Sequence, residues 1–593
     1  MISRSFHIAL PVLVALALDG APAAAQWAPN GIPVCTADGD QSATRGASDG
    51  TGGAVFVWVD ARKPGDPDIY ARRVLANGWI APGWPADGTP VCAATGSQLA
   101  PEAISDGTGG VFILWQDSRM GAGDPDIYLQ RLNSSGAVAS GWPANGLAVC
   151  DTSGVQSDPA ITPDGLGGAV VVWQDYRSGR GLDIYAQRVS AAGRRLWTTQ
   201  GAAVCTDTLD QTGPVCAPDG SGGAFVAWED ARYSTNQISV SDIYVQHLAP
   251  SGAVASGWPV NGTPATPTVG LRFAYVPTMV RDTSGGAIVA WQDYRNINGG
   301  IYALRLTAAG TVAPGWSAGG VAVCDTSGDQ VAPLAAPDGA GGAVIVWEDY
   351  RNGGTRDLFA QRMSEAGTRV PGWLPAGTAV CTAPGDQASP RLVTDGGAPG
   401  EAGSGAVVTW YDYRGGSNTD IYALRLGPAG AVAPGWTANG VALCTAAGDQ
   451  QTPAAVADIG GGAIVAWSDR RSGTSYDIYA QRVTGTGQVA PSVDVPGRPA
   501  PFFRMLEPRP NPASGVAMLD FELPAASAVE ARVFDLAGRV VRTLAGGEHL
   551  PAGAHRLAWD GRDDGGRPVA AGVYLVRLVA GGEAQVRRIV RLR

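Results

Sequence analysis

The chain has 593 residues, more than one hydrophobic core usually supports, so its length predicts at least two folding units. Hydrophobic residues make up 45%, and the 84 glycines and 42 prolines stay below the share typical of disordered chains. The net charge is −11 and the sequence contains no run of basic residues, which excludes nucleic acids and anionic membrane surfaces as partners.

The first 25 residues have the layout of a signal peptide. Arg4 precedes an apolar run over residues 8–18, and Ala23, Ala24 and Ala25 supply the small residues of a cleavage site. The run is too short to cross a bilayer, and no later segment is apolar over the 18 residues that a spanning helix needs. We therefore expect an exported mature chain without a transmembrane segment, located outside the cell or at its outer surface.

Internal repeats are the strongest signal in the sequence. Eight tryptophans recur in the same setting, 55 to 63 residues apart: Trp58, Trp115, Trp173, Trp228, Trp291, Trp347, Trp410 and Trp467. Each unit contains four segments typical of short strands, for example 146–150, 159–161, 168–175 and 183–189. Four strands in a unit of about 57 residues indicate a propeller blade. The predicted fold class is all-β, with an eight-bladed β-propeller over residues 26–490.

The two ends of the repeat region complement each other. Residues 27–35 match residues 436–444, whereas the eighth unit ends at Val483 without a strand of this kind. An N-terminal strand that completes the last blade would close the ring and leave no exposed sheet edge. An open solenoid would need capping repeats, which are not apparent in the sequence. We therefore predict a closed ring.

Polar residues repeat at one end of every predicted blade. The W-x-D-x-R motif ends the second strand with an aspartate and an arginine, and another aspartate opens the next strand in seven units. Opposite charges across such a hairpin are expected to pair. A glutamine in the loop before the inner strand should open on the same face, which would suit a hydroxyl-rich ligand. The candidate ligand-binding residues are Gln98, Gln156, Gln211, Gln330, Gln387, Gln450, Asp117, Arg119, Asp175 and Arg177.

A structural interpretation of these residues stays open, because residues repeated in every blade commonly hold the blade together and glutamines can cap turns. The D-G-x-G-G turns resemble the aspartate boxes of sialidase-type propellers. Nine residues separate aspartate from tryptophan here, longer than in those boxes, so we interpret them as structural turns. Six tryptophans could stack on sugars or pack between blades: Trp84, Trp142, Trp258, Trp316, Trp373 and Trp436.

The sequence offers little for catalysis. His247, the one histidine of the predicted propeller, replaces an arginine of the repeat, which argues against a histidine-rich metal centre and a Ser-His-Asp triad. No catalytic residue, metal ligand or cofactor is predicted. Seven cysteines occupy one strand position in successive units, too far apart to bridge, so we expect them to be buried and free. They are Cys35, Cys92, Cys150, Cys205, Cys324, Cys381 and Cys444.

The repeat pattern is absent from the sequence after residue 490. A proline-rich linker is expected over residues 491–508, followed by alternating strands typical of a small immunoglobulin-like sandwich over residues 509–593. The distinctive motifs are P-N-P at 510–512, F-D-L-A-G-R at 534–539, G-A-H at 553–555, W-D-G at 559–561 and A-G-V-Y at 571–574.

These motifs resemble the C-terminal sorting domains of the type IX secretion system, and equally the immunoglobulin-like domain of flagellar hook-capping proteins. The resemblance implies passage across an outer membrane, with the secretion machinery as a partner. A structural module without a sorting role is the alternative.

Two functions remain open at this stage. The first is a secreted or surface-displayed propeller for binding or adhesion, with a glycan or protein ligand on the loop face. The second is a propeller-type glycan hydrolase or lyase that uses carboxylates from atypical blades. Departures from the repeat occur at residues 233–241, 272–275 and 299–300, and none of them offers a pair of acids. The sequence therefore favours binding.

Overall fold

The computed structural model describes residues 27–235, 238–267, 273–395 and 404–489, and then 504–505, 508, 511–523, 527–535, 538–550, 553–580 and 583–592. The predicted signal peptide and most of the predicted linker lie outside the described residues. Every regular element in the described part is a β-strand, as the sequence predicts. Among these residues, no helix is long and apolar enough to span a membrane. The chain divides into two compact units, 1–492 and 493–593.

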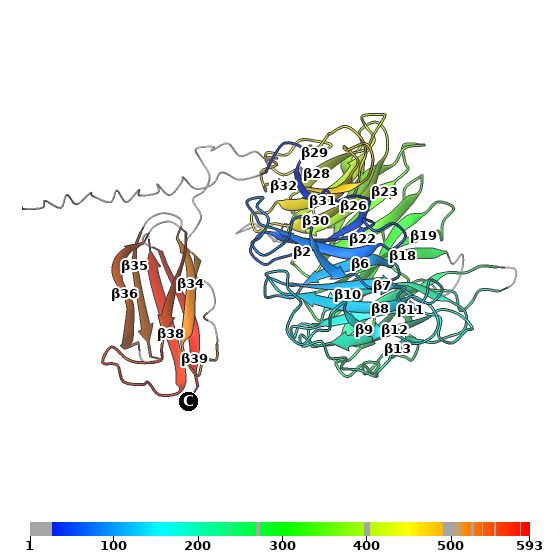
Figure 1. The fold of residues 1–593 in the computed structure, drawn as a ribbon. Helices are drawn as coiled ribbons and strands as arrows, with labels where there is room; N and C mark the ends of the chain where they lie inside the picture. The colour runs from blue at the N-terminus through cyan, green and yellow to red at the C-terminus, as the bar shows by residue number, and fades with distance from the viewer. Residues whose placement is uncertain are drawn as a thin grey trace, which may run out of the picture. The chain divides into compact units, whose positions relative to one another are not determined.

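The first unit consists of eight antiparallel four-stranded sheets, numbered here sheet 1 to sheet 8 (Figure 1). Sheet 1 holds β2 (Gln41–Ser48), β3 (Ala54–Asp60), β4 (Asp68–Val74) and β5 (Thr89–Cys92). Sheet 2 holds β6 (Gln98–Ser105), β7 (Val111–Asp117), β8 (Asp126–Leu132) and β9 (Leu147–Cys150). Sheet 3 holds β10 (Gln156–Pro163), β11 (Ala169–Asp175), β12 (Asp183–Val189) and β13 (Ala202–Cys205). Sheet 4 holds β14 (Gln211–Pro218), β15 (Ala224–Asp230), β16 (Asp242–Leu248) and β17 (Thr263–Pro264).

The remaining four sheets follow the same order. Sheet 5 holds β18 (Ala274–Arg281), β19 (Ala287–Asp293), β20 (Gly300–Leu306) and β21 (Val321–Cys324). Sheet 6 holds β22 (Gln330–Pro337), β23 (Ala343–Asp349), β24 (Asp357–Met363) and β25 (Thr378–Cys381). Sheet 7 holds β26 (Gln387–Thr394), β27 (Ala406–Asp412), β28 (Asp420–Leu426) and β29 (Val441–Cys444). Sheet 8 holds β30 (Gln450–Ala457), β31 (Ala463–Asp469), β32 (Asp477–Val483) and β1 (Ile32–Cys35).

The second strand of each sheet forms its core. In β11 every residue is buried, because both faces of this apolar, β-branched strand are covered by neighbouring sheets. The first strand of each sheet is bulged: the pairing of β10 with β11 shifts register between Ser157 and Ala160. At this bulge Asp158 has a φ of 46°, and Val276 of β18 has a φ of 52° at the equivalent position. The bulge recurs in all eight first strands.

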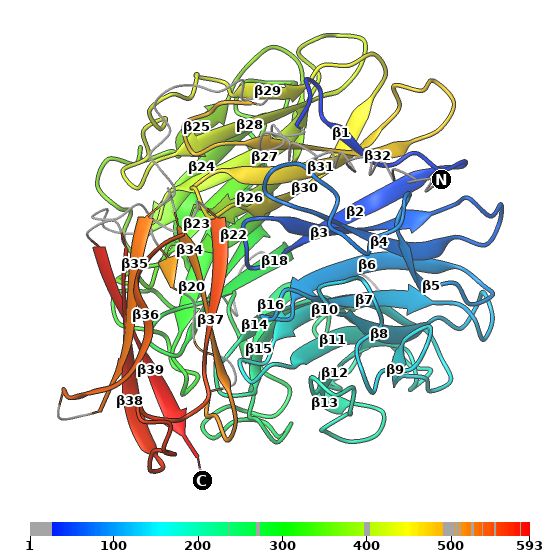
Figure 2. The same ribbon diagram turned by 60° about the vertical axis from the view of Figure 1, so that its left-hand side comes forward.

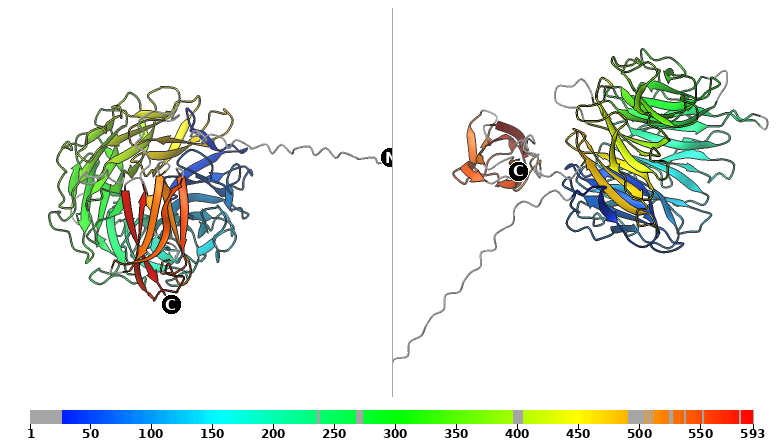
Figure 3. Two further views of the ribbon diagram at one scale, coloured as in Figure 1. Left: turned by 90° about the vertical axis from the view of Figure 1, so that its left-hand side faces the viewer. Right: turned by 90° about the horizontal axis from the view of Figure 1, so that it is seen from above.

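Strands from both ends of the repeat region meet in sheet 8. Ile32 of β1 pairs with Ala480 of β32, and the amide of Gln481 donates a hydrogen bond of 2.7 Å to the carbonyl of Ala28. The guanidinium of Arg471 reaches the carbonyl of Asn30 at 2.7 Å. In Figure 3 (left) the sheets of this unit follow one another around a common centre, from blue through green to yellow. The first strand β2 contacts β30 of sheet 8 as well as β6 of sheet 2.

The second unit is a sandwich of two antiparallel sheets. One holds β33 (Arg504–Met505), β34 (Ala517–Leu523) and β37 (Gly553–Trp559). The other holds β36 (Val540–Leu550), β35 (Ser527–Phe534), β38 (Gly572–Ala580) and β39 (Glu583–Arg591). Alternate residues of both sheets, among them Phe521, Val533 and Val576, share one buried core. The predicted immunoglobulin-like architecture of this unit is confirmed.

Candidate functional site

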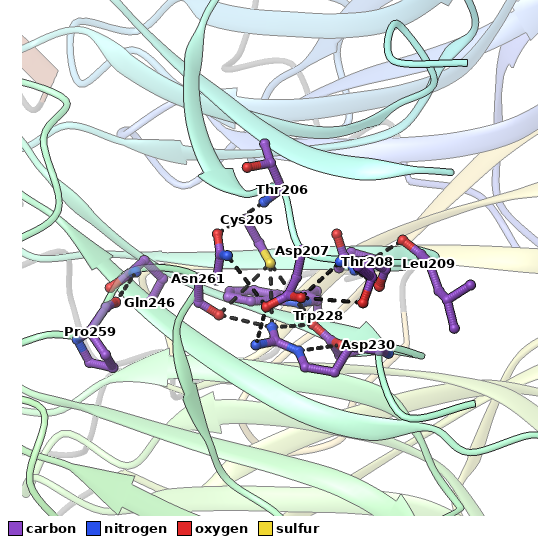
Figure 4. A network of polar contacts seen from close by, with 12 residues as sticks. Cys205, Thr206, Asp207, Thr208, Leu209, Trp228, Asp230, Gln246, Pro259 and Asn261 are labelled. Carbon is purple, nitrogen blue, oxygen red and sulfur yellow. Dashed lines mark hydrogen bonds and ion pairs between the residues drawn. The ribbon is translucent and has the colours of Figure 1, made fainter. Parts of the chain in front are cut away.

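The W-x-D-x-R motif forms a buried polar network in every sheet. In sheet 4, shown in Figure 4, the indole N–H of Trp228 donates to Oδ2 of Asp230 at 2.8 Å, and Nη2 of Arg232 lies 2.6 Å from the same oxygen. The Arg232 guanidinium lies over the ring of Tyr244, with its central carbon 3.8 Å from the ring centroid. The Tyr244 ring in turn stacks against Trp228. The indole-to-carboxylate bond measures 2.7 to 2.9 Å in all eight sheets.

The arginines of this network pair differently from the sequence-based expectation. Nη2 of Arg177 lies 2.5 Å from Oδ2 of Asp175 in its own motif, not against Asp183, the acid that opens the next strand. The same guanidinium lies over the ring of Tyr185, 3.8 Å from its centroid. The expected pairing across the hairpin is therefore wrong.

The acid that opens the third strand is consequently left beside another carboxylate. Asp126 pairs in register with Asp117 across β7 and β8, and it is 3% exposed. Burial, followed by the charges of Asp124, Asp151 and Asp117, raises the pKa of Asp126 to about 7. The equivalent Asp477 of β32 has its pKa raised to about 6, chiefly by burial.

The predicted glutamines lie on the loop face, which we define as the sheet edge where the second strand ends and the first strand begins. Gln156 pairs in register with Asp175, and Asp175 with Asp183, so both loops do open on this edge. The glutamine side chains are, however, fully buried. The amide of Gln98 donates to the carbonyl of Ala94 at 3.2 Å, and that of Gln387 to the carbonyl of Ala383 at 3.1 Å.

These contacts give the glutamines a role in shaping the loops. The guanidiniums of Arg119 and Arg177 are partly exposed, with 19% and 18% of their side-chain surface open to solvent, whereas Asp117 and Asp175 are buried. Ligand binding by the ten predicted residues stays a prediction, and any direct contact in this conformation falls to the two arginines.

The opposite edge of the sheets carries the D-G-x-G-G turns. Oδ1 of Asp164 accepts hydrogen bonds from the backbone N–H groups of Leu166 and Gly168 at 2.7 and 2.8 Å. Nε of Arg188 forms an ion pair with Oδ2 of the same aspartate at 2.9 Å. In sheet 4 the arginine is replaced by His247, whose Nε2 lies 3.3 Å from Asp219. Among the described residues, no cluster of three or more acidic, histidine or cysteine side chains is arranged to hold a metal. The predicted structural role of these turns is confirmed.

The cysteines and the edge tryptophans also lie where the sequence predicts. All eight cysteines are free, and burial raises the pKa of Cys205 to about 12. Trp142 is 7% exposed and donates its indole N–H to the carbonyl of Ala191 in the next repeat at 2.9 Å. These tryptophans therefore pack between sheets, and their rings are not offered to a sugar.

Sheet 5 departs from the repeat and carries two hollows on the loop face. One, of about 390 Å³, is lined by Phe273, Tyr275, Tyr294, Asn296 and Ile297. The other, of about 470 Å³, is lined by Arg295, Asn296, Ile297, Asn298, Asp325, Thr326 and Ser327. The two hollows share Asn296 and Ile297, so they adjoin. The side chains of Tyr275 and Tyr294 meet edge to face with ring centroids 6.4 Å apart.

A half-buried acid lies beside these tyrosines. Oε1 of Glu229, on β15, accepts the backbone N–H of Val276 at 2.8 Å. Burial raises the pKa of Glu229 even though that hydrogen bond opposes the shift, and the charge of Glu229 contributes to a raised pKa of Tyr275. The sequence marked residues 272–275 and 299–300 as unusual, but it gave no sign of Glu229. The residue between the tryptophan and the aspartate of the motif varies between repeats, and it is also a glutamate, Glu348, in sheet 6.

Comparisons with known proteins agree with the two-part architecture. Residues 512–583 match the FlgD Ig-like domain, which confirms the resemblance of the second unit to hook-capping immunoglobulin-like domains. The first unit is a propeller-like repeat of β-sheets. No curated protein matches the sequence.

Solved structures similar to this chain include three carbohydrate-active enzymes. The alpha-L-arabinanase of Penicillium chrysogenum is 12% identical with a TM-score of 0.35, covering 56% of this chain and 97% of its own. The alpha-L-arabinofuranosidase of Fusarium graminearum is 9% identical with a TM-score of 0.33 and the same coverage. The endo-arabinase of Bacteroides thetaiotaomicron VPI-5482 is 14% identical with a TM-score of 0.26, covering 56% and 96%. Similarity at this level carries no inference about activity.

Proposed function

We propose that this chain is an exported glycan-binding protein: a closed eight-bladed β-propeller with its ligand site on the loop face of sheet 5, followed by a C-terminal sorting domain. The observation that carries the proposal is the aromatic hollow at Tyr275 and Tyr294, in a sheet that departs from the repeat. A binding site needs residues that distinguish one place on a symmetric scaffold from the seven others. Sheet 5 has such residues.

The chemistry of the hollow suits a sugar. Tyrosine combines an apolar ring with a hydroxyl group, and a sugar combines apolar ring faces with hydroxyl edges. Asn296 adds amide donors and acceptors, and Asp325 and Thr326 add oxygen acceptors in the adjoining hollow. A few polar groups beside aromatic walls are typical of small-ligand sites.

Ring closure is supported by the pairing of β1 with β32 and by the contact of β2 with β30. With β1 in place sheet 8 has four strands like the other sheets, and it contacts sheet 1, as closure requires. Export and sorting rest on the signal-like N-terminus and on the immunoglobulin-like unit that resembles sorting domains. Deletion of residues 493–593 in the native host is expected to retain the propeller inside the outer membrane, and cell fractionation followed by immunoblotting would detect it. Unchanged surface display would refute the sorting role.

Binding is tested with the mature full-length chain on a glycan array, followed by calorimetric titration of the best ligand. Tyr275→Ala and Tyr294→Ala are each expected to weaken binding about tenfold, the loss of about 1.4 kcal/mol of aromatic contact. Tyr176→Ala is the matched control, because Tyr176 stands at the same motif position as Tyr294 on sheet 3 and is 43% exposed. An equal loss in the control, or no loss at Tyr275 and Tyr294, would remove the site from sheet 5.

Glycan hydrolysis is the second candidate, favoured by one observation. Glu229 is a carboxyl group with a raised pKa beside the hollow, as a general acid requires, and Asp325 is a second acid in the adjoining hollow. An oligosaccharide hydrolysis screen, with arabinobiose as one probe, separates the two functions. Turnover that Glu229→Gln abolishes while leaving ligand binding intact would replace binding by hydrolysis as the function.

A further inference from the structure

The first strands of the eight sheets place one residue each directly after the bulge, and these residues form a row around the centre of the unit. The first strands contact one another in succession, β26 with β30, β30 with β2 and β2 with β6. Figure 2 shows β14, β18, β22, β26 and β30 gathered in the middle, with β5, β9, β25 and β29 outside them. The row consists of Arg45, Glu102, Ala160, Val215, Thr278, Leu334, Arg391 and Ala454.

Three members of this row are charged, and they come from nearby sheets. The four strands that follow one another by contact are β26, β30, β2 and β6, which carry Arg391, Ala454, Arg45 and Glu102 in that order. Ala454 is small and buried. Nε of Arg45 lies 2.8 Å from Oε1 of Glu102, and both side chains are about one-third exposed. Because the five other members are uncharged, charge is concentrated on one side of the row.

One first strand, β30, lies between β26 with Arg391 and β2 with Arg45, since β30 contacts both. Burial and the charge of Arg45 lower the pKa of Arg391, and the charge of Glu102, three sheets further on, raises it. Cys216 of β14, two sheets beyond Glu102, also has its pKa raised by Glu102, after the larger effect of burial. These effects agree with the position of Arg391, Arg45 and Glu102 in one row on first strands that contact one another in succession.

The cluster has one positive charge without a counterion. Arg45 is paired with Glu102 and also donates to the carbonyl of Thr44 at 3.1 Å. Arg391 donates to the carbonyl of Pro390 at 3.0 Å, and no carboxylate of the described chain forms an ion pair with it. By contrast, the arginines of the W-x-D-x-R motifs are paired with aspartate in all eight sheets. A partly desolvated guanidinium with free donors is the group that binds oxyanions best.

We propose that Arg45, Glu102 and Arg391 form a binding site for one oxyanion, a carboxylate, sulfate or phosphate group, at the centre of the propeller-like unit. We refer to these three residues as the axial anion site. The anion contacts the free edge of Arg391 and the part of Arg45 that Glu102 leaves open. A single negative charge balances the cluster, and Glu102 limits affinity by competing for Arg45.

The test is a calorimetric titration of the mature full-length chain with sulfate, phosphate or acetate at constant ionic strength, with chloride as the reference anion. Saturable binding of at least one oxyanion, with one site per chain, is expected. Comparison of the three anions distinguishes a carboxylate site from a sulfate or phosphate site. Arg391→Gln should weaken binding at least tenfold, and Arg391→Lys should retain part of it. The matched control is Arg180→Gln, which removes the same charge from an exposed loop of sheet 3 and should leave binding unchanged.

Glu102→Gln provides the decisive second variant. It removes the competing carboxylate and should strengthen oxyanion binding several-fold, a gain that misfolding cannot imitate. Absence of saturable binding would overturn the proposal. So would binding that Arg391→Gln and Arg180→Gln weaken equally, or that Glu102→Gln weakens. Binding of sulfate or phosphate with the same affinity in all variants would identify an adventitious ion only.

Discussion

Removal of the N-terminal strand is the sharpest test of ring closure. A mature chain that begins at Thr36 lacks β1, and sheet 8 then ends at β32 with an unpaired edge. The deletion removes four side chains that are at most 6% exposed, Trp27, Ile32, Val34 and Cys35, and so uncovers the surfaces against which they pack. It also removes the carbonyl of Asn30 that accepts from Arg471, and that of Ala28 that accepts from Gln481.

The expected loss follows from these four side chains. Full burial of a side chain of this kind contributes about 1.5–3 kcal/mol, so together they contribute about 6–12 kcal/mol. At roughly 2 cal/mol/K per residue, a region of about 460 residues loses about 1 °C of Tm per kcal/mol. The Tm of the first unit should therefore fall by about 6–12 °C.

The assay is thermal unfolding followed by tryptophan fluorescence, to which Trp467 contributes directly because the backbone of Gly31 packs against its ring. Deletion of residues 493–593 is the control, since it removes no strand from the eight sheets. This control should leave the same transition in place. A loss from the β1 deletion that is equal to or smaller than the loss from the control deletion would refute closure by β1.

Three other substitutions or measurements test the repeated network. Trp228→Phe should lower the free energy of unfolding by about 1.5–3 kcal/mol, because the buried Asp230 carboxylate loses its indole donor. The control Trp79→Phe, at a 42% exposed position, should leave that free energy unchanged, and denaturant titration measures both. Burial raises the pKa of Asp126 from an ordinary value of 3.8 to about 7 in the folded protein, so its contribution to stability is complete below pH 4 and is lost as pH rises through 7. Asp126→Asn should therefore raise Tm more at pH 8 than at pH 5, and the opposite order would contradict the raised pKa. The control is Asp38→Asn, a substitution at an exposed position of the same unit. The buried strand-end cysteines should react with a thiol reagent only after unfolding, as the pKa of about 12 for Cys205 implies, and rapid reaction of the native protein would contradict their burial.

The strands could be predicted because they depend on local sequence. The run A-V-V-V-W-Q-D forms β11 and D-I-Y-A-Q-R-V forms β12, within a residue of the predicted bounds. Repetition made the assignment secure, since the same pattern recurs eight times. The partner of each arginine could not be predicted, because it depends on how the Arg177 side chain folds back over Tyr185, a contact that strand register alone does not define.

The candidate sites were only partly visible in the sequence. Tyr275 lies near the start of β18 and Tyr294 directly after the end of β19. They meet because the bulge in β18 sets Tyr275 opposite Gln292. A bulge of one residue changes which side chains share a face, so no periodicity in the sequence reveals the contact. Arg45 and Arg391 lie far apart in the sequence, and their strands come near each other because β2 and β26 both contact β30.

The shared sequence of two strands makes partner choice a matter of folding order. β12 and β32 are both D-I-Y-A-Q-R-V, so β1 would find the same hydrogen-bonding edge on either strand. In the folded chain β12 is paired with β13, which follows it after residues 190–201. This connection is far shorter than the separation of β1 from β12 in the sequence, so its closure entropy is smaller and β13 can pair early. Among the described residues of the unit, no strand follows β32, so its edge stays open for the distant β1. Local pairing thus removes the competing edges first, and the N-terminal strand reaches its correct partner because that edge is the last one left.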